Sequence, residues 1–159
     1  MKKLMKLLLL AGVLAYFGFL PFHGADIREL VPARTVIVTR SGAQYEMDVG
    51  AGVRGIGKTL EEALASLKER VTGVLFVQTA NQVVIKDPAI LPDVTSSSAF
   101  RPGASAYLTR DDPDPEALAD WLEERPAGLT LTRCRALRAR GETPELPVLS
   151  VVEGGFTVD

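Results

Sequence analysis

The sequence predicts a single α+β domain, in which a mixed, mostly antiparallel sheet packs against about three helices and follows an N-terminal signal or anchor segment. Three observations support this fold class. Short β-branched runs separated by turn residues predict strands, apolar residues recur at helical spacing in three places, and no regular strand–helix–strand alternation connects them. With 159 residues, 47% of them hydrophobic, the chain is long enough for one domain with its own core.

The N-terminal segment, residues 1–25, has the layout of a signal peptide or a signal anchor. An uncharged run over residues 7–22 follows a short basic stretch, which is typical of a secretory signal. Its basic residues are Lys2, Lys3 and Lys6. Because His23 stands where a cleavage site needs a small residue, we expect an uncleaved anchor. The lysines should then stay on the cytoplasmic side, and residues 26–159 should be exported.

Composition argues against several classes of function. The formal net charge is −2 even with the N-terminal lysines included, so the body is acidic and lacks the basic footprint of a nucleic-acid-binding protein. The only histidine is His23, outside the body, so no serine there has an imidazole to activate it. Cys134 is the only cysteine, which excludes an internal disulfide and the cysteine-rich metal patterns. We expect Cys134 to be a small core residue.

The first half of the body predicts a hairpin, a helix and two more strands. Residues 33–39 are rich in β-branched side chains, and residues 44–49 alternate apolar with polar side chains after a turn at Ser41–Gly42. Apolar positions then recur at helical spacing over residues 60–70. The next strands are expected at residues 74–77 and 83–85.

The second half predicts a long loop followed by a strand, two helices and two final strands. Residues 88–103 are rich in proline, serine and glycine, which is typical of a loop. The next strand is expected over residues 104–109. Helices are expected over residues 115–124 and from Thr130 or Thr132 to Arg140, where Gly141 ends the second one. The final strands are expected at residues 146–152 and 156–158.

A cluster of aspartates before the second helix has two possible roles. Asp111, Asp112 and Asp114 resemble a metal-binding group, but the regular ligand spacing and glycine turn of a calcium loop are absent. We therefore expect Asp114 to be the N-cap of a helix with Pro115 at its first position, and no metal site. Trp121 should anchor this helix in the core, with an exposed docking role as the alternative.

The stretch from residue 52 to residue 59 has two incompatible interpretations. It matches the phosphate-binding pattern G-x-x-x-x-G-K-[ST] at Gly52, Gly57, Lys58 and Thr59. In such a loop the N–H groups hold phosphates, the lysine neutralises them and the threonine binds Mg²⁺. The same stretch also suits a helix start, in which Thr59 is the N-cap and Glu62 completes a capping box. The strand before it alternates polar and apolar residues, unlike the buried parallel strand that feeds a phosphate loop, so we prefer the capping role and expect no cofactor.

Several short motifs follow one another in an order that resembles a known family. They are Asp26, Arg28 and Glu29; Val36 to Thr39; Gly57–Lys58–Thr59 with Glu62–Ala63–Leu64; Leu75–Phe76 with Val83 to Ile85; and Pro144 to Leu149. This order resembles the N-terminal domain of the C-subunit of spore-germination receptors, the Ger(x)C family. The resemblance spans nearly the whole exported part. Gly24–Ala25 stand where that family has its lipid-bearing cysteine, so lipidation is not implied, and the family's C-terminal domain would follow where this chain ends.

The resemblance implies a non-enzymatic accessory subunit at the outer face of the spore inner membrane. Such a subunit works through contacts with integral-membrane germinant-receptor subunits, and the family offers no catalytic residues to transfer. The resemblance also accounts for Gly57–Lys58–Thr59 without a phosphate. Two alternatives stay open: a nucleotide-binding protein that uses the residues of the phosphate-binding pattern, and an unrelated exported domain that binds the cell envelope.

Overall fold

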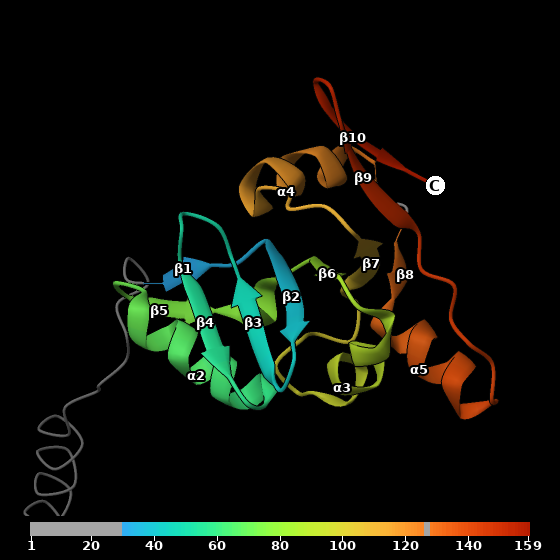
Figure 1. Cartoon of the computed structure of the whole chain (residues 1–159), viewed down its shortest axis with the longest axis horizontal. Coiled ribbons are helices and arrows are strands. Elements are labelled where there is room, and N and C mark those ends of the chain that lie inside the picture. Colours follow the sequence, from blue (N-terminus) through green and yellow to red (C-terminus); the bar gives the residue numbers. More distant parts are fainter. Residues whose placement is uncertain (1–29, 126–127) are drawn as a thin grey trace, which may run out of the picture.

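A computed structural model describes residues 30–125 and 128–159, and an eight-stranded mixed sheet forms its centre (Figure 1). Its strands are β2 (Thr35–Ser41), β3 (Gln44–Asp48), β4 (Arg54–Gly57), β6 (Gln82–Ile85), β7 (Ser105–Thr109), β8 (Leu129–Thr130), β9 (Val148–Val152) and β10 (Gly155–Val158). Their order across the sheet is β10-β9-β7-β6-β2-β3-β4, and β8 pairs with β7. Two further strands, β1 (Leu30–Pro32) and β5 (Val74–Phe76), form a separate parallel ribbon.

Helices cover both faces of this sheet. The α-helices of the described residues are α2 (Leu60–Arg70), α3 (Leu91–Ser96), α4 (Pro115–Glu124) and α5 (Leu131–Ala139). Short 3₁₀ turns, η2 (Val77–Thr79) and η3 (Pro88–Ile90), flank β6. In Figure 1, α4 lies on one side of the sheet, and α2, α3 and α5 lie on the other. The described part of the chain is therefore a three-layer arrangement.

The central strands are buried on both faces, as their sequences require. In β2, Val36 and Val38 belong to the larger core, which α2, α3 and α5 cover, whereas Ile37 belongs to the smaller core against α4. In β6, Val83 and Val84 divide between the two cores in the same way. Continuous apolar runs of this kind are typical of parallel strands that have helices on both sides.

The sheet is mixed, as predicted, with four antiparallel and three parallel strand pairs, but its centre is parallel, which the sequence analysis did not anticipate. The four central strands β2, β6, β7 and β9 run parallel, and antiparallel pairs occur only toward the two sides, in β2–β3–β4, β7–β8 and β9–β10. Parallel neighbours need crossover connections, and the one between β6 and β7 contains α3. Because this helix lies within the predicted loop of residues 88–103, local sequence patterns did not indicate the crossover.

The short helix α3 was missed because prolines flank its start. Pro88 begins η3 and Pro92 lies in the first turn of α3, where a proline is tolerated because the missing N–H has no helical partner there. Asp87 caps this segment by accepting a hydrogen bond from the Ala89 N–H at 2.9 Å. Residues 30–125 and 128–159 accordingly contain four α-helices, where the sequence predicts about three.

The other predicted elements are confirmed. The hairpin β2–β3 turns at Gly42, whose φ of +61° lies in the left-handed region that glycine adopts readily. The helices expected at residues 60–70 and 115–124 have those bounds, and α5 ends one residue before Arg140. The predicted strand at residues 74–77 is shorter, because Val77 begins η2 and β5 pairs only with β1.

The predicted signal or anchor segment, residues 1–25, and the motif residues Asp26, Arg28 and Glu29 lie outside the described residues. Across residues 30–125 and 128–159, none of the helices combines the length and the apolar character needed to cross a bilayer. Residues 30–125 and 128–159 form one domain, because both hydrophobic cores pack against opposite faces of the same sheet.

Candidate functional site

The phosphate-binding pattern is divided between two structural elements. Gly52 lies in the turn between β3 and β4 with a φ of +72°, whereas Gly57 ends β4 and pairs with Tyr45 of β3. Strand β4 is antiparallel to β3 and is the last strand in the order of the sheet. A phosphate loop instead joins a buried parallel strand to a helix, so this geometry does not fit one.

Glycine in β4 is explained by packing against α2. A Cβ atom at Gly57 would lie 2.4 Å from the Ala63 nitrogen, and one at Gly55 would lie 2.1 Å from the Ala63 carbonyl oxygen. Both distances are far shorter than any side chain permits, so the two glycines allow the strand backbone to approach the helix. The glycine of the pattern thus serves a strand–helix contact.

The predicted cap at the start of α2 is confirmed. The Thr59 hydroxyl accepts a hydrogen bond from the Glu62 N–H at 3.1 Å, and the Glu62 carboxylate accepts one from the Lys58 N–H at 2.8 Å. The return bond reaches Lys58, one residue before the N-cap, where a standard capping box would reach the N-cap itself. The backbone N–H of Lys58 is therefore bound to the protein's own carboxylate.

A tyrosine–aspartate contact lies beside this helix start. Tyr45 of β3 donates a hydrogen bond to the Asp93 carboxylate of α3 at 2.5 Å, and both residues line a hollow of about 300 Å³ together with Lys58 and Thr59. This hydrogen bond, assisted by burial of the ring, raises the pKa of Tyr45 above its ordinary value of 10.0. The contact joins the antiparallel side of the sheet to the crossover helix.

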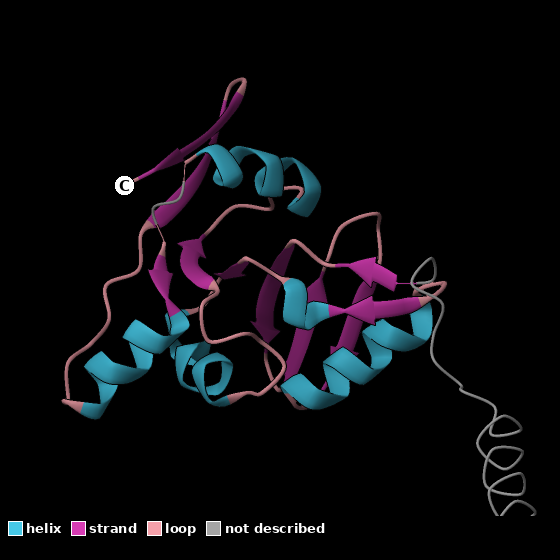
Figure 2. Ribbon diagram, turned by 180° about the vertical axis from the view of Figure 1, so that it is seen from behind, coloured by secondary structure: helices cyan, strands magenta, loops and turns pink. Residues whose placement is uncertain are grey.

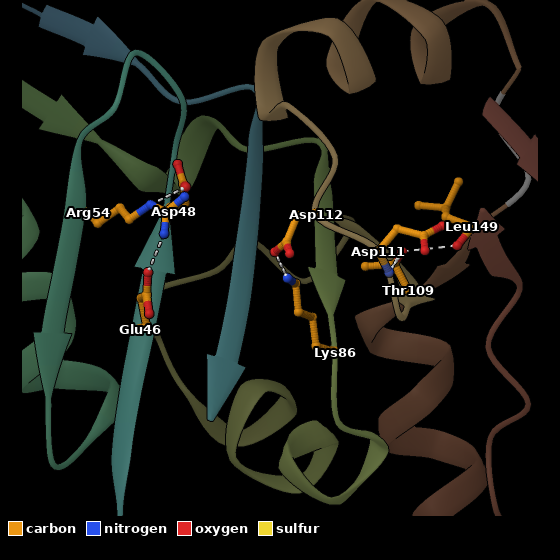
Figure 3. Close-up of polar contacts among 8 residues, drawn as sticks. All are labelled: Glu46, Asp48, Arg54, Lys86, Thr109, Asp111, Asp112 and Leu149. Atoms are coloured by element: carbon orange, nitrogen blue, oxygen red, sulfur yellow. Dashed lines mark hydrogen bonds and ion pairs between the residues drawn. The ribbon is translucent and has the colours of Figure 1, made fainter. Parts of the chain in front are cut away.

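A second hollow, of about 290 Å³, carries a group of charged side chains on the sheet face opposite α2 (Figure 3). Arg54 of β4 lies 3.0 Å from Glu46 and 2.8 Å from Asp48, both on β3, and Asp48 contributes most to the raised pKa of Arg54. Lys86, directly after β6, pairs with Asp112, and that hydrogen bond lowers the pKa of Asp112. Both cations of this hollow are thus paired within it, where three carboxylates face two cations.

The aspartate cluster is divided among three separate contacts. Asp111 accepts a hydrogen bond from the Val151 N–H at 2.7 Å and so holds β9 beside the end of β7. Asp112 faces Lys86, and Asp114 caps α4 by accepting from the Ala117 N–H at 3.1 Å. The capping role predicted for Asp114 is therefore confirmed. In residues 30–125 and 128–159, no three acidic, histidine or cysteine side chains gather into a group able to hold a metal ion.

The structure confirms the role predicted for Cys134 and refines the one predicted for Trp121. Cys134 of α5 is fully buried in the larger core, and burial raises the pKa of its thiol. Trp121 of α4 is only half-buried, and its ring packs edge-on against Phe156 of β10 with centroids 5.9 Å apart. The Arg125 guanidinium lies over the same ring, with its Cζ atom 5.1 Å from the ring centroid. Trp121 thus attaches α4 to the C-terminal hairpin at the margin of the smaller core.

A third hollow, of about 350 Å³ and mainly apolar, was not predicted from the sequence. We call it the ribbon cavity, because the β1–β5 ribbon forms one of its walls. Its other walls are the turn between β3 and β4, the first turns of α4 and the C-terminal end of α2. No short motif contains its lining residues, since they come from segments far apart in the chain.

No family model, curated protein or solved structure matches this chain. Among the features of the described part without a structural role are the outward face of the β1–β5 ribbon and the ribbon cavity beneath it.

Proposed function

We propose that this chain is a non-enzymatic, membrane-anchored accessory subunit of a spore germinant receptor, which acts through contacts with integral-membrane receptor subunits. The Ger(x)C resemblance suggests this role. The contacts of Thr59, Glu62 and Gly57 support it, because they give the most enzyme-like motif of the sequence a purely structural use. The observation that carries the proposal is the exposed apolar face of the β1–β5 ribbon.

The β1–β5 ribbon presents apolar side chains to water. The parallel register pairs Leu30 with Val74 and Pro32 with Phe76 on one side, which we call the outward face, although Pro32 also lines the ribbon cavity and Val31 of the other side is itself 38% exposed. Val74 is 40% exposed and Phe76 is 44% exposed, whereas Leu75, on the opposite face, is 3% exposed. An exposed group of apolar side chains on one surface marks a site of interaction.

The position of the ribbon suits a partner within the membrane. β1 begins at Leu30, and the predicted anchor ends at Ala25. From Ala25 to Leu30 the chain makes five steps, which span at most about 18 Å when fully extended, at roughly 3.5 Å per residue. On a membrane-embedded anchor, the apolar face would therefore lie near the outer surface of the bilayer, within reach of the extracytoplasmic parts of receptor subunits. In Figure 2 the ribbon lies at the margin of the domain beside α2, where a partner has access to it.

Co-purification from sporulating cells tests this proposal. Tagged full-length chain, extracted in mild detergent, should carry multi-spanning receptor subunits with it. The double variant Val74→Ser/Phe76→Ser should recover at least about tenfold less receptor, because it removes the apolar face without touching either core. Val151→Ser/Val152→Ser is the matched control, since these β9 valines are 48% and 44% exposed at the far side of the sheet.

Two results would contradict the proposal. One is equal recovery of receptor subunits by the ribbon variant and by the control. The other is the absence of any membrane-spanning partner, and if cell-wall material is recovered in its place, the exported envelope-binding domain becomes the better hypothesis.

A further inference from the structure

Strand β4 forms a free edge of the sheet (Figure 1). Within residues 30–125 and 128–159 it pairs with β3 alone, and it is the last strand in the order across the sheet. A free edge presents backbone N–H and C=O groups that can pair with another extended chain. Protein domains use such edges to bind segments of their partners, which add to the sheet as an extra strand.

The register of the β3–β4 pair shows which backbone groups of β4 point outward. The Val49 N–H donates to the Val53 carbonyl at 3.5 Å, next to the turn of this hairpin. Hydrogen-bonded and non-hydrogen-bonded pairs alternate along an antiparallel ladder, so the two glycines of β4 also direct their N–H and C=O groups toward β3. The N–H and C=O groups of Arg54 and Ile56 then point away from β3, and none of the described residues hydrogen-bonds to them.

Strand β4 lacks the devices that commonly protect a sheet edge. It contains no proline and no lysine, and its pairing with β3 has no bulge. Its one charged side chain, Arg54, lies 3.0 Å from Glu46 and 2.8 Å from Asp48, both on β3. Ile56 lies on the same face of the strand as Arg54 and is 44% exposed. The edge is therefore open, with an apolar side chain beside it.

The position of α2 restricts what can pair with this edge. Gly55 and Gly57 face the backbone of Ala63, so the helix lies directly over β4. A second copy of the chain, paired antiparallel through its own β4, would bring its α2 to within about 5 Å of this one, the spacing of neighbouring strands. Packed helices need roughly 8–10 Å between their axes. The edge therefore suits a single extended segment, whose side chains on the α2 face have to be small.

From these features we propose that the free edge of β4 binds an extended segment of a partner protein, which adds to the sheet as an antiparallel strand. The backbone of the segment exchanges hydrogen bonds with Arg54 and Ile56. Small side chains of the segment face α2 and alternate with apolar ones, which lie beside Ile56. An acidic residue at the N-terminal end of the segment meets Lys58, which follows β4, is exposed and forms no ion pair within the described residues.

Fluorescence anisotropy of a labelled peptide with the full-length chain in mild detergent tests the proposal. The peptide Glu-Ala-Val-Ala-Val has the required pattern and should bind saturably, with a Kd of about 1 mM or below. N-methylation of its central valine should weaken binding at least about tenfold, because that N–H faces the Ile56 carbonyl. N-methylation of the second alanine, whose N–H points away from β4, is the matched control and should change the Kd by less than about threefold. Replacing the glutamate by lysine should weaken binding by about three- to tenfold.

The variant Ile56→Pro tests the same contact from the side of the protein. Proline removes the outward N–H without removing a hydrogen bond to β3, and the residue before it is glycine, which tolerates a following proline. This variant should bind the peptide at least about tenfold more weakly. Ile56→Ala keeps the N–H and should bind within about threefold of the wild type. A thermal unfolding curve shows whether each variant is folded, and the N-methylated peptides test the proposal on the wild type whatever that curve shows.

Four outcomes overturn the proposal. They are no saturable binding at about 5 mM peptide, equal affinity for the two N-methylated peptides, and wild-type affinity in folded Ile56→Pro. The fourth is a dimer of the chain alone that Ile56→Pro dissociates, which would give the edge to a second copy. The proposal stands apart from the proposed function: peptide binding depends on the β4 edge and receptor recovery on the ribbon, so either can fail while the other holds.

Discussion

At the scale of single residues, glycine has two different uses in this chain. Gly52 gives a turn its positive φ and faces open space, whereas Gly55 and Gly57 keep β4 in contact with α2. The phosphate-binding pattern includes one glycine of each kind, so a match in sequence joins two residues that have unrelated physical reasons to be glycine. Only the neighbours of each residue in space distinguish them.

We expect Gly55→Ala to destabilise the protein by about 3 kcal/mol or more, because its Cβ would collide with the backbone of Ala63. Gly103→Ala is the matched control: a Cβ there meets nothing within 4 Å, and the backbone does not have a positive φ. It should change stability by less than about 1 kcal/mol, and in the stabilising direction. Urea denaturation of both variants measures the difference. Equal midpoints would show that β4 and α2 are not in close contact.

At the scale of elements, local capping defines where the helices begin. Thr59, Asp114 and Thr130 each accept a hydrogen bond from the N–H three residues later, at the starts of α2, α4 and α5 respectively. Such bonds satisfy N–H groups that have no partner within the helix. Because the cap and its partner are neighbours in sequence, these helix starts are predictable without tertiary information.

We expect Thr59→Ala to lower the free energy of unfolding by about 1 kcal/mol, because the Glu62 N–H loses its acceptor. Lys58→Ala should change it by less than about 0.5 kcal/mol, since Lys58 contributes only its backbone N–H to the cap. Thermal unfolding with and without ATP and Mg²⁺ also separates the two interpretations of this stretch. A melting temperature that rises with nucleotide in the wild type but not in Lys58→Ala would restore the nucleotide-binding alternative.

At the scale of the whole molecule, one sheet separates two cores of unequal size. The larger core includes Cys134 of α5 and Leu67 of α2, which approach the sheet from the same side. The smaller core joins Leu118 of α4 to Val84 of β6 on the other side. Because both cores share the central strands, we expect the described domain to unfold as a unit.

The thiol of Cys134 reports on this unfolding. It is fully buried, and burial raises its pKa above the ordinary value of 9.0, so the folded state favours the protonated thiol. Burial of the protonated thiol therefore stabilises the folded state fully at pH values below about 9. This stabilisation is lost as the pH rises through the folded-state pKa, because the unfolded thiol ionises first. The difference in unfolding free energy between wild type and Cys134→Ala should therefore be smaller at pH 10 than at pH 7 in urea titrations.

A labelling experiment provides the control for this prediction. A thiol reagent should modify native Cys134 slowly and only through unfolding, whereas a cysteine introduced as Val151→Cys in the Cys134→Ala background should react at once. Rapid labelling of Cys134 in the native state, or a difference in unfolding free energy that grows with pH, would contradict the burial of this residue in the larger core.

The sequence by itself determined the elements whose signals are local. Helical spacing together with caps located α2, α4 and α5, and alternation around Gly42 located the β2–β3 hairpin. The expectation that Thr59 caps a helix also came from residues within one turn of each other. Local signals suffice in these cases because each hydrogen bond or apolar stripe involves residues only a few positions apart.

Only the tertiary structure decided the features that join distant segments. The parallel order of the central strands depends on crossovers that local patterns do not encode, and the outward face of the ribbon depends on the pairing of Leu30 with Val74. The ribbon cavity likewise brings together α2 and α4, helices that are separated in the sequence by β5, β6, α3 and β7. These features follow from packing the apolar faces of all elements into common cores, and no single segment contains the information for that packing.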